Sequence, residues 1–412
     1  MPFIPFNLPT IDEEEIQEVV DTLRSGWLTT GPKTAQFERE FQDYVGATHA
    51  LAVNSATSAM HLALSGLGIG PGDEVITTPL TFCATVNTIL QVGATPVLAD
   101  VGADGNIDPV SIAEKRTPRT RAIMPVHIGG LSCNMEAIWR IAREHGLYVI
   151  EDAAHAVGTH YKGLPIGADR RAEDYRSDAV CFSFYATKNL TTGEGGMVVT
   201  PDENLFNRMK TLCLHGISKD AWNRYSDKGN WYYEVDACGF KYNLSDILSS
   251  IGIHQLRKQE RFIEKRSACA RFYNEAFADV PEVETPPDNP VNRHSWHLYA
   301  IRLNLEMLEI DRNEFIRELR RQEIGTSVHF IPIPMHPAYE QFAHLPQNCC
   351  PSALNLYPRL ISLPLYPSMT EEQLRHIVSA VKNIAVAHRV RRVAGGTIGA
   401  FPARPDKNPV QI

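Results

Sequence analysis

Short apolar runs and longer amphipathic stretches alternate along the first half of the chain. The apolar runs have the length and composition of strands and lie at residues 74–78, 95–101, 121–127, 148–152, 179–184 and 196–200. Amphipathic segments such as 56–67 and 134–145 lie between such runs and are long enough for crossover helices. This alternation is typical of a mostly parallel sheet that helices cover on both faces. We therefore predict a large α/β domain over residues 1–250.

A different pattern begins near residue 242. Its apolar residues have the spacing of one helix face and predict a helix that continues to about residue 266: Leu244, Ile247, Leu248 and Ile251. Further on, the pattern predicts a strand, a helix and a second strand, at 297–303, 312–322 and 326–330. These elements indicate a smaller C-terminal α/β domain at 251–390. The last segment, 391–412, shows no periodicity and predicts a flexible tail.

The composition is that of a soluble globular protein, with 43% hydrophobic and 21% charged residues among 412. The formal net charge is -8, and no basic stripe is visible, so we expect no binding to nucleic acid. No apolar run reaches the ~18 residues of a membrane span, and no signal peptide is evident at the start. We therefore expect a cytoplasmic protein without a membrane segment.

A metal centre is not expected either. The eight cysteines show no C-x-x-C spacing, and several lie in apolar stretches, so reduced thiols are favoured over a disulfide framework or a zinc site. His329 and His336 lie on a proline-rich extended segment, and no nearby carboxylate or cysteine completes a ligand set. Substrate contact or simple packing is the interpretation that we prefer for both histidines.

Two functional side chains follow predicted strands of the large sheet. The strand at 148–152 ends in Glu151 and Asp152, and the strand at 179–184 leads to Lys188, which small residues and glycines surround. The carboxyl ends of parallel strands meet at one edge of an open sheet, where functional groups gather. We therefore expect Asp152 and Lys188 to face the same cleft.

These residue types suit pyridoxal phosphate (PLP). A neutral lysine amine attacks an aldehyde, and a carboxylate beside the pyridine nitrogen keeps the ring protonated so that it acts as an electron sink. Ser55, Ala56 and Thr57 open a predicted helix, whose first N–H groups are suited to bind a phosphate. Each element also has an ordinary interpretation, as a capped turn, a helix N-cap or a surface lysine. Their joint occurrence in this order favours the cofactor site.

The chain also resembles a known family through motifs that occur in the same order. The motifs lie at residues 25–32, 54–57, 70–75, 125–127, 151–155, 182–184 with Lys188, and 239–246. Across residues 6–387 the chain resembles the DegT/DnrJ/EryC1/StrS sugar aminotransferases, a branch of the fold-type-I PLP enzymes. The resemblance implies the aspartate aminotransferase-like fold, with a large, mixed and mostly parallel sheet and a smaller C-terminal α/β domain.

The resemblance also implies roles for individual residues. Lys188 is expected to hold PLP covalently, Asp152 to pair with the pyridine nitrogen, and Phe82 to stack on the ring. The other residues that match cofactor contacts are Ser55, Ala56, Thr57, His155, Ser183 and Asn243. Asn243 matches a residue that reaches the phosphate from a second subunit, which implies a homodimer with shared active sites.

The same resemblance suggests a substrate. His155 stands where relatives carry His, Gln or Glu, and the His form resembles enzymes that aminate C4 of a UDP- or dTDP-linked 4-keto-6-deoxy sugar. A histidine that only forms hydrogen bonds under the cofactor is the alternative. Tyr185 replaces a histidine of some C4 enzymes, which leaves the sugar open. The residues that match substrate contacts are Thr29, Tyr185, His215 and His329, and the loops that contain Asp220–Trp222 and Arg293–His297 resemble substrate-side loops.

We therefore predict transamination of a nucleotide-linked keto sugar with glutamate as donor, in which the cofactor alternates between PLP and pyridoxamine phosphate (PMP). Amination at another carbon, or of a cyclitol, is the main alternative. Related sugar dehydratases carry His in place of the lysine, so Lys188 argues against that reaction. A regulatory protein that binds PLP without turnover is the remaining alternative, and mixing with glutamate would distinguish it.

Overall fold

The computed structural model describes residues 1–170, 176–217, 233–289, 291–340 and 348–390. The predicted tail at 391–412 and the predicted substrate-side residues 220–222 lie outside the described residues. Within these ranges, no helix has both the length and the apolar character that crossing a membrane requires.

The larger sheet has seven strands in the order β1-β9-β8-β5-β4-β2-β3. The strands are β1 (His49–Val53), β2 (Glu74–Thr77), β3 (Thr95–Leu98), β4 (Thr120–Met124), β5 (Tyr148–Asp152), β8 (Ala179–Ser183) and β9 (Gly196–Thr200). Only β9 runs antiparallel to its neighbours; the remaining pairs are parallel. The structure thus confirms the predicted mixed, mostly parallel sheet and all six predicted strands. The edge strand β1 was not predicted.

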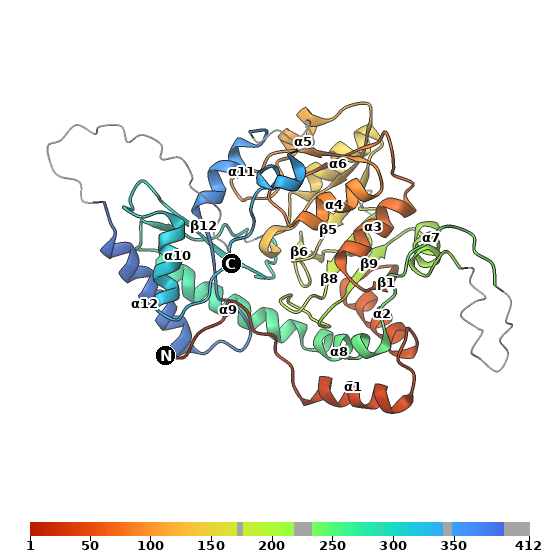
Figure 1. Cartoon of the computed structure of the whole chain (residues 1–412), viewed down its shortest axis with the longest axis horizontal. Coiled ribbons are helices and arrows are strands. Elements are labelled where there is room, and N and C mark those ends of the chain that lie inside the picture. The colour runs from red at the N-terminus through yellow and green to blue at the C-terminus, as the bar shows by residue number, and fades with distance from the viewer. Residues whose placement is uncertain (171–175, 218–232, 290, 341–347, 391–412) are drawn as a thin grey trace.

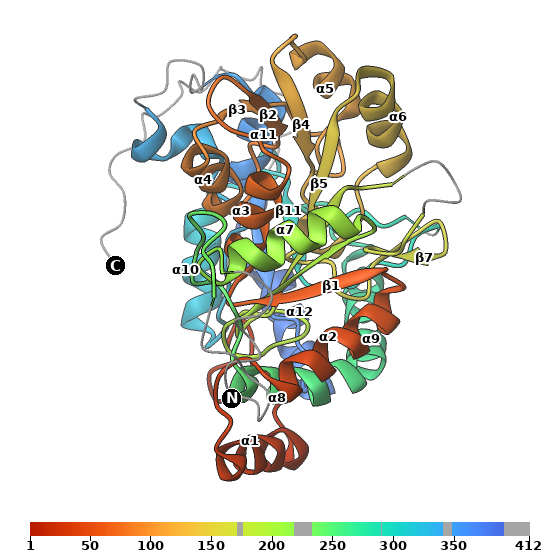
Figure 2. The same ribbon diagram turned by 90° about the vertical axis from the view of Figure 1, so that its right-hand side faces the viewer.

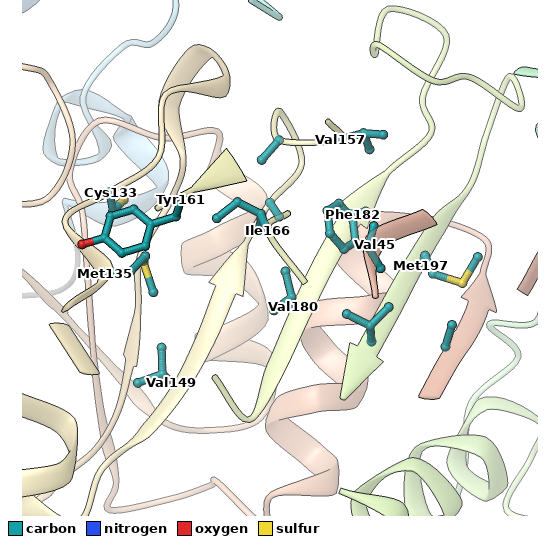
Figure 3. Close-up of a cluster of buried hydrophobic side chains, with 14 of the residues drawn as sticks. Val45, Cys133, Met135, Val149, Val157, Tyr161, Ile166, Val180, Phe182 and Met197 are labelled. Atoms are coloured by element: carbon teal, nitrogen blue, oxygen red, sulfur yellow. The ribbon is translucent and has the colours of Figure 1, made fainter. Parts of the chain in front are cut away.

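Helices cover both faces of this sheet (Figures 1 and 2). Successive strand residues point to opposite faces, so Phe182 and Met197 belong to one hydrophobic cluster, while Cys181 and Val198 belong to another. The first cluster includes residues of α2 (Pro32–Val45), α5 (Pro109–Lys115), α6 (Met135–His145) and α8 (Asp246–Arg257), and Figure 3 shows part of it. The second includes residues of α3 (Ala56–Gly66), α4 (Cys83–Gln91) and α7 (Glu203–Cys213). Burial on both faces explains why the strands read as continuous apolar runs.

A smaller antiparallel sheet consists of β10 (Val283–Glu284), β11 (Tyr299–Leu303) and β12 (Leu360–Leu363). Its core includes residues of α9 (Gln259–Phe277), α10 (Arg312–Arg321) and α12 (Glu371–Ala387). The predicted strand at 326–330 is wrong. Neighbours already occupy both edges of β11, and the segment contributes only an isolated bridge from Ser327 to Ser362 at the outer edge of β12.

The predicted long helix after residue 244 is two helices, α8 and α9, which meet at Lys258. The Lys258 ammonium is buried and contacts the carboxylates of Asp12 and Glu15 at 2.9 and 2.6 Å, beside α1 (Glu13–Ser25). The N-terminal segment also reaches the smaller sheet, because Ile4 packs in its core and pairs with Ile324. The division between residues 250 and 251 remains a prediction.

Candidate active site

A cavity of about 510 Å³ opens at the carboxyl ends of the central strands. Asp152 ends β5, Ser183 ends β8, and Ser55 follows β1 by two residues. All of the following predicted site residues line the cavity: Ser55, Ala56, Thr57, Phe82, Asp152, His155, Ser183, Tyr185, Lys188 and His329. Residues more than 270 positions apart in sequence, such as Ser55 and His329, therefore line the same cavity.

Asp152 is a buried carboxylate that neutral donors hold in place. Its Oδ2 accepts a hydrogen bond from Thr85 Oγ1 at 2.8 Å, and its Oδ1 accepts one from the Ala154 N–H at 3.1 Å. Burial raises the pKa of Asp152, while the two hydrogen bonds and the nearby Lys188 charge favour the ionised form. A protonated pyridine nitrogen in the cavity would supply the positive charge that a buried carboxylate favours.

Lys188 lies in the loop after β8, half-buried, with its backbone N–H donating to the Tyr185 carbonyl at 2.9 Å. Burial lowers the pKa of Lys188 to about 8, and the Asp152 carboxylate opposes that shift. A substantial fraction of the amine is therefore neutral near physiological pH. This is the state in which a lysine attacks an aldehyde.

The amino end of α3 forms a cradle for a phosphate. Ser55 is the N-cap, and its hydroxyl accepts a hydrogen bond from the Ser58 N–H at 3.1 Å. The first N–H groups of a helix have no intrahelical acceptor, and the first turn of α3 contains no acidic residue that would repel an anion. Thr57 and Ser183, which also carry hydroxyl groups, line the same cavity.

Gly196 allows this cradle to approach the sheet. It pairs with Val53 on β1 and with Ser183 on β8. A Cβ atom at this position would lie 2.5 Å from the Ser55 carbonyl carbon and 2.7 Å from the Ala56 nitrogen. Because both are backbone atoms, the start of α3 would have to move to make room.

We predict that Gly196→Ala weakens PLP binding by about tenfold or more, because moving the start of α3 would weaken at least one hydrogen bond to the phosphate. A charge-assisted hydrogen bond is worth roughly 1.5–3 kcal/mol, and a tenfold change in affinity corresponds to about 1.4 kcal/mol. Titration of the apoenzyme with PLP measures the change. Gly70→Ala is the matched control, since a Cβ there meets its nearest atom at an ordinary 3.5 Å. Equal PLP affinity of the two variants would contradict the close-approach argument.

Phe82 presents an aromatic ring to the cavity. The residue is 60% exposed although it is large and apolar, and it lies at the N-cap of α4. Its ring centroid lies 6.2 Å from that of Phe330, which lines the same cavity. An exposed ring beside a cavity of this size is suited to stack on a flat cofactor.

The tautomer of His155 follows from its hydrogen bond. The Gly129 N–H donates to Nδ1 at 3.2 Å, so the proton of the neutral ring lies on Nε2. Burial holds the pKa of His155 well below its usual value, and the Lys188 charge adds to the effect. His155 is therefore a neutral hydrogen-bond donor.

Two more neutral imidazoles lie beside His155. The centroid of His297 is 4.4 Å from that of His155, and its Nδ1 lies 3.2 Å from Oδ1 of Asn189, the neighbour of Lys188. Burial holds the pKa of His297 well below its usual value and lowers that of His329 to about 4. His329 also stacks on Phe6 and lies 2.8 Å from Ser362 Oγ. His155, His297 and His329 thus present uncharged imidazoles on one side of the cavity, which we call the imidazole wall.

Three predicted site residues do not line this cavity. The Thr29 carbonyl accepts from the Asp246 N–H at 3.2 Å, and the exposed His215 donates its backbone N–H to Phe240 at 2.7 Å. Asn243 donates to Thr30 Oγ1 at 2.6 Å. Thr29 and His215 therefore contact the segment 240–246, to which Asn243 belongs. We call this segment, with Thr29 and His215, the 240–246 surface.

Sequence reasoning did not identify several groups that complete the site. Thr85, in the first turn of α4, holds Asp152, and Gly129 sets the His155 tautomer. Phe330 is adjacent to His329 in sequence, and His297 ends the segment 293–297, which resembles a substrate-side loop but gives no sign of which residue faces the site. A short polar side chain such as Thr85, or a backbone group such as the Gly129 N–H, has no sequence pattern that marks it as part of a site, so only the folded structure identifies it.

Known proteins share both the sequence and this architecture. The model of the DegT/DnrJ/EryC1/StrS aminotransferase family matches residues 9–382. SpsC of Bacillus subtilis, a spore coat polysaccharide biosynthesis protein, is 50% identical over 384 residues, which cover 93% of this chain and 97% of SpsC.

Solved structures agree. Spr1654 of Streptococcus pneumoniae, assigned as a sugar aminotransferase, matches in its PLP form with a TM-score of 0.86 and 32% identity, covering 93% of this chain and 99% of that chain. Its PMP form gives the same TM-score. Helicobacter pylori PseC, an aminotransferase involved in the biosynthesis of pseudoaminic acid, has a TM-score of 0.85 and 31% identity, covering 94% of this chain and all of PseC. The chain belongs to the DegT/DnrJ/EryC1/StrS aminotransferase family and is a PLP-dependent sugar aminotransferase of fold type I.

Proposed function

We propose that the protein transfers an amino group from glutamate to C4 of a UDP- or dTDP-linked 4-keto-6-deoxy sugar. The observation that carries this proposal is the convergence of Lys188, Asp152 and the neutral His155 on one cavity. The biosynthetic roles in the names of SpsC and PseC, which concern a polysaccharide and pseudoaminic acid, support a carbohydrate substrate. Amination at another carbon, or of a cyclitol, is the alternative.

In this proposal PLP, when bound, supplies the electron sink for the carbon that loses and regains its proton. The Asp152 carboxylate pairs with the ring nitrogen, and the start of α3 with Ser183 binds the phosphate. Lys188 moves the proton in both half-reactions. A pKa of about 8 suits this double role, because the amine then gains and loses a proton readily near neutral pH.

The imidazole wall suits the sugar ring. His297, His329 and Tyr185 offer hydrogen bonds without fixed charge, and Phe330 offers an apolar face. These groups match a neutral ring with several hydroxyls. His155 donates from Nε2, either to the cofactor or to the substrate.

The negative charge of the substrate suggests a second subunit. Among the described residues that line the cavity, Lys188 is the one lysine or arginine, so a nucleotide diphosphate would lack a positive partner within this subunit. We propose a homodimer in which the 240–246 surface of one subunit, with Thr29, His215 and Asn243, completes the cavity of the other. We also propose that this enzyme acts in the cytoplasm.

The test follows the cofactor spectrum of the holoenzyme. Glutamate should convert the PLP form to the PMP form, and a UDP- or dTDP-linked 4-keto-6-deoxy sugar should return it to the PLP form. A 3-keto nucleotide sugar and a cyclitol ketone serve as controls. Return of the PLP spectrum only with one of these controls would reject C4 amination, and no response to glutamate would reject the proposed donor.

A further inference from the structure

Cys349 and Cys350 bring two thiol groups into contact away from the cavity. Their Sγ atoms are 3.3 Å apart. The Cys350 side chain is buried, whereas Cys349 is partly exposed. No other contact between cysteine sulfurs occurs in the part of the chain that the structure describes, and neither residue lines the cofactor cavity.

The surrounding structure keeps the two sulfurs together. The pair directly precedes α11 (Pro351–Leu356), and the Asp100 carboxylate accepts the N–H groups of Ser352 and Ala353 at 2.8 and 3.0 Å. Cys350 packs in a hydrophobic cluster with residues of α4 and α11, which lie near each other in Figures 1 and 2. The backbone on the C-terminal side of the pair is therefore fixed.

The two thiols differ in their chemistry. The hydrogen bond with Cys350 lowers the pKa of Cys349, and Lys115 lowers it further, while burial opposes both effects. The same hydrogen bond and burial raise the pKa of Cys350. Because the thiolate is the nucleophile, the accessible Cys349 is suited to react first. Cys350 is then in contact to react second.

We propose that Cys349 and Cys350 form an oxidative modification site, where a hydroperoxide converts the two thiols into a vicinal disulfide. The Cys349 thiolate attacks the peroxide; an S–O bond forms, the O–O bond breaks, and the released alkoxide or hydroxide takes up a proton. The Cys350 sulfur then attacks the sulfenic acid sulfur; the S–S bond forms and the S–O bond breaks. The departing hydroxide takes up the Cys350 thiol proton and leaves as water. Overall, the thiols lose two electrons and one hydroperoxide gains them.

The product should be easily reduced. Consecutive Cα atoms lie about 3.8 Å apart across a trans peptide, closer than the roughly 4.4–6.8 Å found for most disulfides. This constraint strains the bond and makes it more oxidising. A dithiol reductant should therefore restore both thiols, which makes the modification reversible.

The test treats the full-length holoenzyme with hydrogen peroxide and then alkylates the remaining thiols. We expect the peptide that contains both cysteines to lose two hydrogen masses and to resist alkylation, and dithiothreitol to reverse both changes. In Cys350→Ser, Cys349 should instead accumulate a sulfenic acid that dimedone traps. Circular dichroism of each variant checks that it is folded.

Cys238 provides an internal control, because it is exposed and makes no sulfur contact among the described residues. It should give a dimedone adduct but no intramolecular disulfide in the same sample. A dimedone adduct at Cys349 in the wild-type protein, or two thiols that still alkylate after peroxide, would overturn the proposal. These thiol measurements do not depend on the sugar substrate, so they are independent of the proposed function.

Discussion

Lys188→Ala should abolish turnover and remove the absorbance band of the covalent lysine–cofactor link. Loss of general acid–base catalysis alone costs about a hundredfold to ten-thousandfold. The same substitution also removes the covalent attachment, because no other lysine lines the described cavity. The cradle at α3 remains, so the variant should still bind PLP, but more weakly. Absorbance spectra and single-turnover assays with glutamate measure both effects.

Lys188→Arg is the matched variant for this experiment. It keeps the positive charge beside Asp152 but cannot form the link or move the proton in the same way, because arginine stays protonated. Both variants should be inactive, while Lys188→Arg should retain more of the stability of the wild-type protein. Turnover in either variant, or an unchanged lysine–cofactor band, would reject the assignment of Lys188.

The lowered pKa of Lys188 predicts a pH dependence for the capture of PLP. Since the pKa of Lys188 is about 8, the amine is mostly protonated at lower pH and then cannot attack the PLP aldehyde. The rate at which the wild-type apoenzyme captures PLP should therefore rise with pH and level off above about 8. A lysine with an ordinary pKa would show its rise near 10.5 instead.

The large sheet was predictable because its strands carry a local signal. Burial on both faces gives continuous apolar runs, as in residues 179–183, and the strand ends placed Asp152 and Lys188 at one edge. The edge strand β1 carries a weaker signal because two of its five residues are alanine. Amphipathic helices such as α6, with a cap at Asn134 and a left-handed Gly146, were equally visible.

The other features of the fold and the site depend on contacts between residues that are far apart in sequence. The break at Lys258 lies in a helical pattern, and carboxylates near residue 12 hold it, about 245 positions away in sequence. The bond from Thr85 to Asp152 and the position of His297 beside His155 likewise require the folded chain. Tertiary packing determines these helix breaks and side-chain contacts, and neither composition nor periodicity predicts them.

Asp152→Asn should lower turnover by about tenfold to a hundredfold or more while leaving the fold intact. The amide keeps the size of the carboxylate and can still accept the Thr85 hydroxyl, whose hydrogen bond is 2.8 Å long. It loses the charge that holds the pyridine nitrogen protonated, and a charge-assisted hydrogen bond is worth roughly 1.5–3 kcal/mol, or about one to two powers of ten in rate. Initial rates with saturating PLP and glutamate measure the loss.

Asp178→Asn separates this chemical effect from a general cost of changing a hydrogen-bonded carboxylate. Burial also raises the pKa of Asp178, and its carboxylate accepts the Val149 N–H at 2.8 Å, but at the opposite ends of β5 and β8. Both variants should lose some thermal stability, since each replaces a hydrogen-bonded carboxylate. Only Asp152→Asn should change the spectrum of the bound cofactor and the rate, because only that carboxylate faces the cavity. Equal rates in the two variants would mean that Asp152 does not pair with the cofactor ring.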